Sequence, residues 1–310
     1  LKSDIQDKSI GNISSPQSVR IVCRLWSLFN NHNSIRKDFE NKVKSLEGNR
    51  IGDFASTESL TKLEEQWNLV QSGERKYMEK NIINDIVEND YFEVPKNSSE
   101  DPDIVLENGE MFELKVSHLY KARGLVRPRY RLVLKVLNYE DMAQHADWRN
   151  SQLYKKLKQM VIVFYYKDEE KPPWEWIVTS SFLWFSAEYN DEIQSDYTLT
   201  RNRVLAGQKI SESDTNFLAN CPKHHSKFCW YCHVGQECSN PKKPSDAPHP
   251  VLDGALRPHP TLGVGEKRGY CIPAQRMAKV FSDEVGIDLE RRGGGSKPSY
   301  GIPIEKVPHL

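Results

Sequence analysis

The stretch Asp103-Ile-Val-Leu-Glu-Asn-Gly-Glu-Met-Phe-Glu113-Leu-Lys115 decides how the middle of this 310-residue chain folds. Both flanks of its Asn108-Gly109 pair are rich in Val, Ile, Leu and Phe. An Asn-Gly pair between two apolar runs predicts a β-hairpin. Glu113 and Lys115 are two residues apart, so on a strand their side chains point to the same face.

The length of the hairpin loop decides where Asp103 points, because a shift of one residue in register moves a side chain to the opposite face. A two-residue loop, residues 108–109, pairs Asp103 with Leu114 and turns it away from Glu113. A three-residue loop, residues 107–109 with the glycine left-handed, pairs Asp103 with Glu113. We predict the three-residue loop, because only that register gathers both carboxylates and the lysine on one face.

Two carboxylates beside a lysine are suited to phosphodiester chemistry. The spacing Asp103-x9-Glu113-x-Lys115, with Pro102 before the aspartate, has the form of the PD-(D/E)xK nuclease signature. Carboxylate oxygens suit a hard cation such as Mg²⁺, which polarises the scissile phosphate and lowers the pKa of a bound water. Lys115 can orient that water or offset developing charge. Taken alone the pattern is loose, and an exposed strand with a surface Glu/Lys pair is the alternative.

The composition is that of an ordinary globular chain. Lys and Arg number 43, as do Asp and Glu, so the formal net charge is zero. A nucleic-acid binder of this composition therefore needs a local basic surface. No apolar run approaches a membrane span and the polar N-terminus shows no signal peptide, so we expect a cytoplasmic protein. Six cysteines in this length do not indicate a disulfide scaffold.

The hydrophobic pattern predicts an α+β protein in three regions. They are an N-terminal helical arm (1–75), a domain with a central mixed sheet flanked by helices (76–290), and a flexible C-terminal tail after a Gly-rich segment (291–310). Strands are expected at 103–106, 111–117, 130–137, 159–166 and 174–178, and helices at 18–29, 59–69, 76–87 and 191–206.

A run of basic residues without an acid follows the predicted hairpin: Lys121, Arg123, Arg127, Arg129, Arg131 and Lys135. Such clusters supply phosphate contacts, so we predict DNA contacts from the four arginines, the alternative being a solvated loop and strand edge. Arg127-Pro-Arg129 is expected to project as a loop. Lys156 and Lys158 precede the apolar strand 159–166, where they are either end-of-strand charges or able to reach the acids. We also predict a DNA contact from Lys158.

A Cys/His-rich segment, residues 221–265, predicts an insertion with a structural Zn²⁺ site. The Cys229-Trp-Tyr-Cys232 pair has the spacing of zinc ligands. The candidate ligands are Cys221, Cys229, Cys232, Cys238 and His224. The alternative is a set of partly buried free thiols beside surface histidines.

Four stretches resemble the MutH-like endonucleases, a family that contains the methyl-directed mismatch-repair nicking enzyme and related GATC-cutting restriction enzymes. They are Pro102-Asp103 with Phe-Glu113-Leu-Lys115, Arg131-Leu-Val-Leu-Lys-Val-Leu-Asn138, Lys156-Leu-Lys158, and Ala206-Gly-Gln-Lys-Ile-Ser-Glu-Ser-Asp-Thr-Asn-Phe-Leu-Ala-Asn-Cys221. The resemblance spans roughly residues 76–285. It implies a restriction-endonuclease-like fold for the central mixed sheet.

The resemblance also implies roles for single residues. The family's upstream helical glutamate maps to Glu88, with Asp85 as a rival, and its essential lysine after the core site maps to Lys156. Arg257, followed by Pro258, resembles a base-reading arginine, which can bind guanine bidentately. Cys271 lies where the family has a tyrosine that senses adenine methylation.

Two departures from the family pattern bear on specificity. The spacing between Asp103 and the Glu-Leu-Lys triplet is longer than the family's, and the Cys/His-rich segment is an insertion beside the DNA-reading loops. The resemblance therefore does not imply that the recognition site is GATC.

The sequence favours a Mg²⁺-dependent, sequence-specific double-stranded DNA endonuclease of the type II restriction kind. Asp103 and Glu113 would bind the metal, and Glu88 would support a second metal or the water. Lys115 would help to activate the nucleophile, and Lys156 would act at the phosphate. A homodimer on a palindromic site is expected, since two strands need two active sites. The alternatives are a mismatch-repair-type nicking enzyme and a DNA-binding module without activity.

Overall fold

The computed structural model describes residues 33–79, 81–94, 101–136, 138–205, 253–256, 268–272, 274–292 and 299–310. Within these ranges no helix has the length and apolar character needed to cross a membrane.

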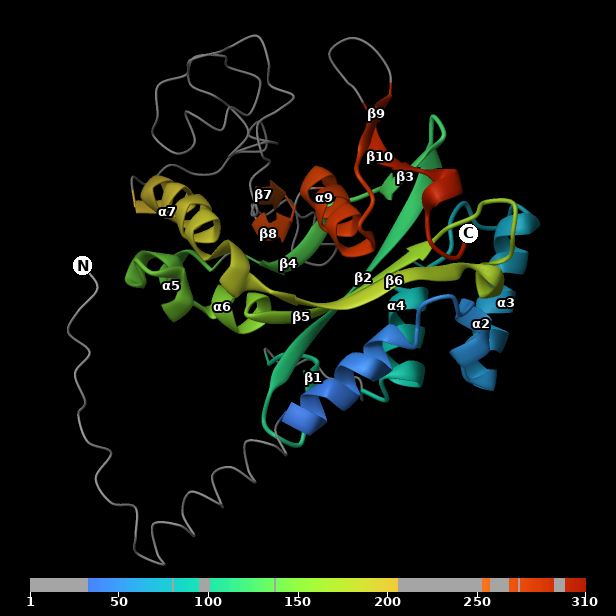
Figure 1. Ribbon diagram of the computed structural model, residues 1–310, viewed down its shortest axis with the longest axis horizontal. Coiled ribbons are helices and arrows are strands. Elements are labelled where there is room, and N and C mark those ends of the chain that lie inside the picture. Colours follow the sequence, from blue (N-terminus) through green and yellow to red (C-terminus); the bar gives the residue numbers. More distant parts are fainter. Residues whose placement is uncertain are drawn as a thin grey trace, which may run out of the picture.

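A mixed sheet of seven strands forms the centre of the described protein (Figure 1). Strand β2 (Met111–Ala122) runs parallel to β5 (Gln159–Tyr166), and the other paired neighbours are antiparallel. The order is β6-β5-β2-β3-β10-β9, and β1 pairs separately with β2. The remaining strands are β1 (Ile104–Val105), β3 (Leu125–Pro128), β6 (Ile177–Phe185), β9 (Glu290–Arg292) and β10 (Ser299–Pro303). The predicted α+β class with a central mixed sheet is confirmed.

Strand β5 is buried on both faces, which explains its continuous apolar sequence. Met160, Ile162 and Phe164 belong to one core cluster, and Val161 and Val163 belong to the other. The sheet therefore separates two hydrophobic layers.

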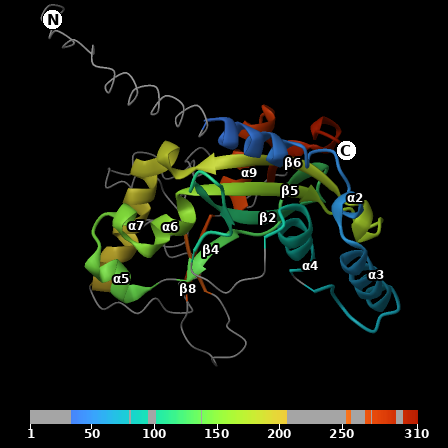
Figure 2. The same ribbon diagram turned by 90° about the horizontal axis from the view of Figure 1, so that it is seen from below.

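Helices from the N-terminal part cover one face of the sheet (Figure 2). They are the helix at residues 33–44, α2 (Ile51–Phe54), α3 (Thr57–Gln71), α4 (Ile82–Asp85) and the π-helix η1 (Ile86–Tyr91). Val43 and Leu63 are fully buried in the same cluster as Val161 of β5. The described part of the expected arm, residues 33–71, thus packs against the sheet, and residues 1–32 lie outside the described ranges.

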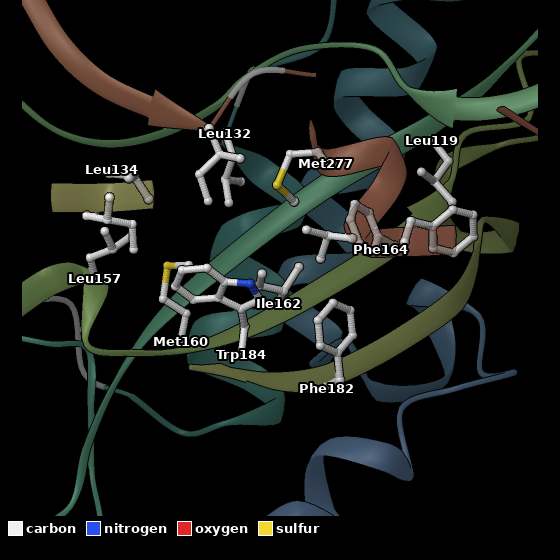
Figure 3. Close-up of a cluster of buried hydrophobic side chains, with 14 of the residues drawn as sticks. Leu119, Leu132, Leu134, Leu157, Met160, Ile162, Phe164, Phe182, Trp184 and Met277 are labelled. Carbon is white, nitrogen blue, oxygen red and sulfur yellow. The ribbon is translucent and has the colours of Figure 1, made fainter. Parts of the chain in front are cut away.

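The opposite face is covered by helices α5 (Tyr139–Gln144), α6 (Gln152–Leu157), α7 (Asn190–Leu205) and α9 (Ala274–Val285), together with a second sheet. That sheet has the order β4 (Leu132–Val136), β8 (Arg268–Ile272), β7 (Asp253–Leu256). Figure 3 shows Leu132 and Leu134 of β4 and Met277 of α9 packed with Met160 and Ile162 of β5. Short helical turns η2 (Trp148–Asn150), η3 (Pro173–Glu175), η4 (Ser186–Tyr189) and η5 (Ile304–Lys306) connect these elements.

The prediction of a flexible tail over residues 291–310 is wrong for the part that the structure describes. Strand β10 pairs with β3, and Ile302 and Val307 are buried in the core. The close approach depends on Gly301, where a Cβ would lie 2.7 Å from the Val126 carbonyl oxygen. The Gly-rich segment led to the prediction of a tail, although the residues of β10 that follow it form a core strand.

The prediction of a loop around Arg127 is also wrong. Residues Leu125–Pro128 form strand β3, which pairs with β2 through a tight turn at Arg123 and Gly124. Both turn residues have positive φ, 54° and 74°, as a two-residue type I′ hairpin requires. Pro128 is tolerated because it ends the strand.

Candidate active site

The β1–β2 hairpin has the register that gathers the acids. Ile104 pairs with Phe112, so one step further along both strands sets Asp103 opposite Glu113. The loop contains residues 107–109, closed by a 2.8 Å hydrogen bond from the Leu106 N–H to the Glu110 carbonyl. Gly109 has a φ of 82°. The predicted three-residue loop with a left-handed glycine is confirmed.

The Asp103 carboxylate is fixed by the strand that it faces. Its Oδ2 accepts a 2.8 Å hydrogen bond from the backbone N–H of Leu114. One carboxylate oxygen is thus committed to the backbone, and Oδ1 is the oxygen left for other chemistry.

Glu113 lies at the centre of the site and is only 3% exposed. Lys115 Nζ lies 2.5 Å from its Oε1, and Lys156 Nζ lies 2.7 Å from its Oε2. The second contact is an ion pair without hydrogen-bond geometry, since Lys156 Nζ donates instead to the Asp101 carbonyl at 2.7 Å. A buried carboxylate is stable only when it is paired, and two ammonium groups supply that pairing here.

Glu88 lies in the π-helix η1 and is half-buried. Burial raises the pKa of its carboxyl above the usual range, the Asp103 and Asp85 charges add to this, and Lys115 opposes it. Glu113 also contributes to raising this pKa. Glu88 is therefore electrostatically part of the same group, and π-helical segments are frequent at functional sites.

The acids have the oxygen donors that a hard cation prefers, but their present arrangement does not form a metal-binding site. Across the described ranges no three His, Cys, Asp or Glu side chains are close enough together to hold an ion. Glu88, Asp103 and Glu113 offer only oxygen donors, and their mutual repulsion would be relieved by a divalent cation. Both Glu113 oxygens face lysines, so metal binding requires Glu113 to exchange an ammonium contact for the ion.

Sequence reasoning missed two backbone groups of this site. The Asp101 carbonyl holds Lys156, and the Leu114 N–H holds Asp103. Every residue carries such groups, so the sequence offers no direct signal for them. Pro102 gives an indirect signal. A proline restricts the residue before it to extended backbone, so Pro102 helps to fix the position of the Asp101 carbonyl.

The predicted DNA-contacting residues do not form one surface beside Glu113. Arg123 and Arg127 lie at the opposite end of β2, in the β2–β3 hairpin. Arg131 Nη1 lies 3.9 Å from the Cys271 Sγ at the second sheet. Lys158, exposed after α6, has its Nζ 5.9 Å from the centre of the Tyr154 ring. Arg257 and the five predicted zinc ligands, Cys221, His224, Cys229, Cys232 and Cys238, lie outside the described residues.

Residues 92–196 match a protein-family model described as the DNA mismatch repair enzyme MutH. This segment of the chain is therefore similar to the MutH endonuclease family. The match covers about a third of the chain and contains Asp103, Glu113, Lys115 and Lys156. Glu88 lies just before it, and the segment 206–221 lies beyond it. No curated protein sequence matches the chain.

The MutH-like family indicates a DNA endonuclease of the nicking or restriction kind, with DNA as its partner. The acidic hairpin and the lysine before β5 fall inside the matched segment. The geometry of the site and the family match therefore point to the same chemistry.

Proposed function

We propose that this MutH-like chain is a Mg²⁺-dependent endonuclease that cuts double-stranded DNA at a specific sequence, as type II restriction enzymes do. The observation that carries the proposal is the arrangement around Glu113: a buried carboxylate opposite Asp103, in contact with Lys115 and Lys156. A surface Glu/Lys pair would be exposed, whereas this carboxylate is 3% exposed.

Asp103, Glu113 and Glu88 are the residues that would hold the metal. Bound Mg²⁺ supplies a Lewis acid for the phosphate and lowers the pKa of a water molecule. Asp103 Oδ1, which accepts no hydrogen bond from the described residues, and one oxygen of Glu113 are the donors proposed for it.

We assign different roles in hydrolysis to the two lysines of the site. Hydrolysis forms a bond from the water oxygen to phosphorus and breaks the bond to the leaving sugar oxygen, which takes up a proton. Lys115 lies on the same strand face as Glu113 and is suited to orient the water. Lys156 is anchored by the Asp101 carbonyl and is suited to offset negative charge that builds up on the phosphate.

Cutting both strands of a palindromic site requires two active sites related by two-fold symmetry, so we propose that a homodimer forms on DNA. Sedimentation of the protein with a short duplex, without Mg²⁺, tests this. The proposal expects two chains for each duplex that carries the recognition site. One chain for each duplex under saturating protein would contradict it.

A second candidate is a strand-nicking enzyme, because the matched family model carries the description of a mismatch repair enzyme. A supercoiled plasmid distinguishes the two. Type II activity converts it to linear DNA with defined ends, whereas a nicking enzyme stops at the open circle. Intact supercoiled DNA with Mg²⁺ present would leave only a DNA-binding module and would overturn both.

A further inference from the structure

The end of strand β2 that lies far from Glu113 carries a group of aromatic and basic side chains, which we call the Tyr130 surface. Its members are His118, Tyr120, Arg127, Arg129 and Tyr130. They come from β2, β3 and the residues just after β3. Figure 1 shows β3 beside the end of β2 opposite to β1.

Close ring and guanidinium contacts connect these five residues. The Arg127 Cζ lies 5.4 Å from the Tyr120 ring centre, and its Nε donates a 3.0 Å hydrogen bond to the Tyr120 hydroxyl. The Arg129 Cζ lies 5.6 Å from the Tyr120 ring and 5.5 Å from the Tyr130 ring. His118 meets Tyr130 edge to face, with centroids 5.3 Å apart. The guanidinium of Arg129 is thus positioned by two rings rather than free to move in solvent.

Tyr130 is the member of this surface that offers an aromatic ring to a ligand. It is 59% exposed, although a large aromatic side chain normally gains free energy by burial. Arg129 beside it keeps 41% of its side chain exposed. The two side chains form an exposed pair of one ring and one cation.

The Tyr130 surface is separate from the candidate active site. Seven residues of extended strand between Glu113 and Tyr120 correspond to about 23 Å. On a strand, side chains an odd number of residues apart point to opposite faces, so His118 and Tyr120 lie on the face away from Glu113. His118 contacts Tyr165, which belongs to the core cluster under the N-terminal helices. DNA bound at the acids therefore does not account for this surface.

The local charge favours stacking over a purely electrostatic contact. The β5–β6 loop carries three acids, Asp168, Glu169 and Glu170, between Lys167 and Lys171, and Lys171 Nζ lies 3.8 Å from Asp168. Arg129 is 3.5 Å from Glu169, which is 72% exposed. A duplex hides its bases and presents dense phosphate charge, so it gains little here. A single strand offers unpaired bases for a tyrosine and isolated phosphates for an arginine.

We propose that the Tyr130 surface binds single-stranded DNA, with an unpaired base stacked on Tyr130 and a neighbouring phosphate paired with Arg129. This goes beyond the proposed cleavage reaction and does not depend on it. The surface allows one molecule to hold an unpaired strand while its acids engage a duplex.

The test is fluorescence anisotropy with a labelled oligothymidylate, without Mg²⁺ so that no strand is cut. Stacking of one base is worth about 1–3 kcal/mol, so Tyr130→Ala should weaken binding by roughly 5- to 150-fold, and Tyr130→Phe should retain it. Tyr77→Ala is the matched control. That ring is 73% exposed and has Lys76 Nζ 5.4 Å from its centre, but it lies after α3.

A second variant changes affinity in the opposite direction. Glu169→Gln removes the counter-charge of Arg129, so oligothymidylate binding should become tighter. Tyr130→Ala should still cleave duplex DNA in the presence of Mg²⁺ as the parent does, which separates this surface from the proposed nuclease activity. Equal affinity of Tyr130→Ala and parent, or an equal loss in Tyr77→Ala, would overturn the proposal, as would a loss of duplex binding as large as that of single-strand binding.

Discussion

The Lys156 ammonium lies 2.7 Å from Glu113 Oε2, although the two residues come from helix α6 and strand β2. The fold explains the contact. Glu113 pairs with Met160 at the start of β5, and α6 ends just before that strand. Because β2 and β5 are parallel neighbours, the residues at their beginnings lie at the same end of the sheet.

Lys156→Ala should reduce cleavage while leaving DNA affinity nearly unchanged. Removing one group that stabilises transition-state charge typically lowers kcat by about 100- to 1000-fold. Lys156→Arg should recover part of that loss. Lys158→Ala is the control, because Lys158 is exposed and contacts the Tyr154 ring. Equal kcat values for the Lys156→Ala and Lys158→Ala variants would rule out a role at the phosphate.

Deleting Val105, a strand residue that is 63% exposed, should abolish cleavage without unfolding the sheet. The three-residue loop is kept, so Asp103 moves one position along β1 to face Phe112, and its side chain then points away from Glu113. Gly109→Ala is the matched control in the same hairpin. It places a side chain at a φ of 82°, where nothing lies within 4 Å, so it should cost about 1–2 kcal/mol of stability and leave the register intact. Plasmid cleavage and urea unfolding measure both effects, and an active Val105 deletion would refute the importance of this register.

Activity should fall at acidic pH because Glu88 becomes protonated. Burial raises the pKa of Glu88, and the charges of Asp103 and Asp85 raise it further. The proposed catalysis needs the ionised carboxylate of Glu88, and this form is lost as pH falls through a pKa above the usual one for glutamate. Higher Mg²⁺ should move the acid limb of kcat/KM to lower pH, since a cation favours the charged form. Glu88→Gln should lower activity and remove this limb. A limb that persists unchanged in Glu88→Gln belongs to another group.

The chain should lose stability between about pH 6.5 and pH 4 through His118. Burial, with the charges of Lys167 and Arg129, lowers its pKa to about 4. The unfolded chain takes up this proton at a higher pH than the folded one, so stability is present above the unfolded pKa and falls as pH decreases. At pH 5 the loss is up to about 2 kcal/mol, and partial exposure reduces it. His118→Phe should show a smaller change in urea midpoint between pH 7 and pH 5; an identical change would contradict this.

The sequence predicted the central strands and the hairpin better than it predicted the periphery. Strand β5 is a continuous apolar run, and the hairpin register followed from the requirement that Asp103 meet Glu113. Prediction failed where local signals were misleading. The Gly293-Gly-Gly-Ser-Lys-Pro segment suggested a tail, yet β10 gains its stability from pairing with β3, a contact between distant parts of the chain.

The basic run after the hairpin shows a different limit. Its residues are close together in sequence, but β3 belongs to the large sheet and β4 to the small one. The chain passes from one sheet to the other between Arg127 and Arg131, and composition alone does not reveal this. Basic residues that are close in sequence therefore need not form one basic surface.

The central claim is that the Glu113 carboxylate is required for Mg²⁺-dependent cleavage. The direct measurement is the cleavage rate of duplex DNA over a Mg²⁺ titration for the parent, Glu113→Gln and Glu110→Gln. Glu110 is the matched control, since it lies on the same hairpin but its Oε1 is 3.8 Å from Arg36. We predict that Glu110→Gln cuts like the parent and that Glu113→Gln is inactive at every Mg²⁺ concentration, whereas parental cleavage by Glu113→Gln, or cleavage by the parent in excess chelator, would contradict the account.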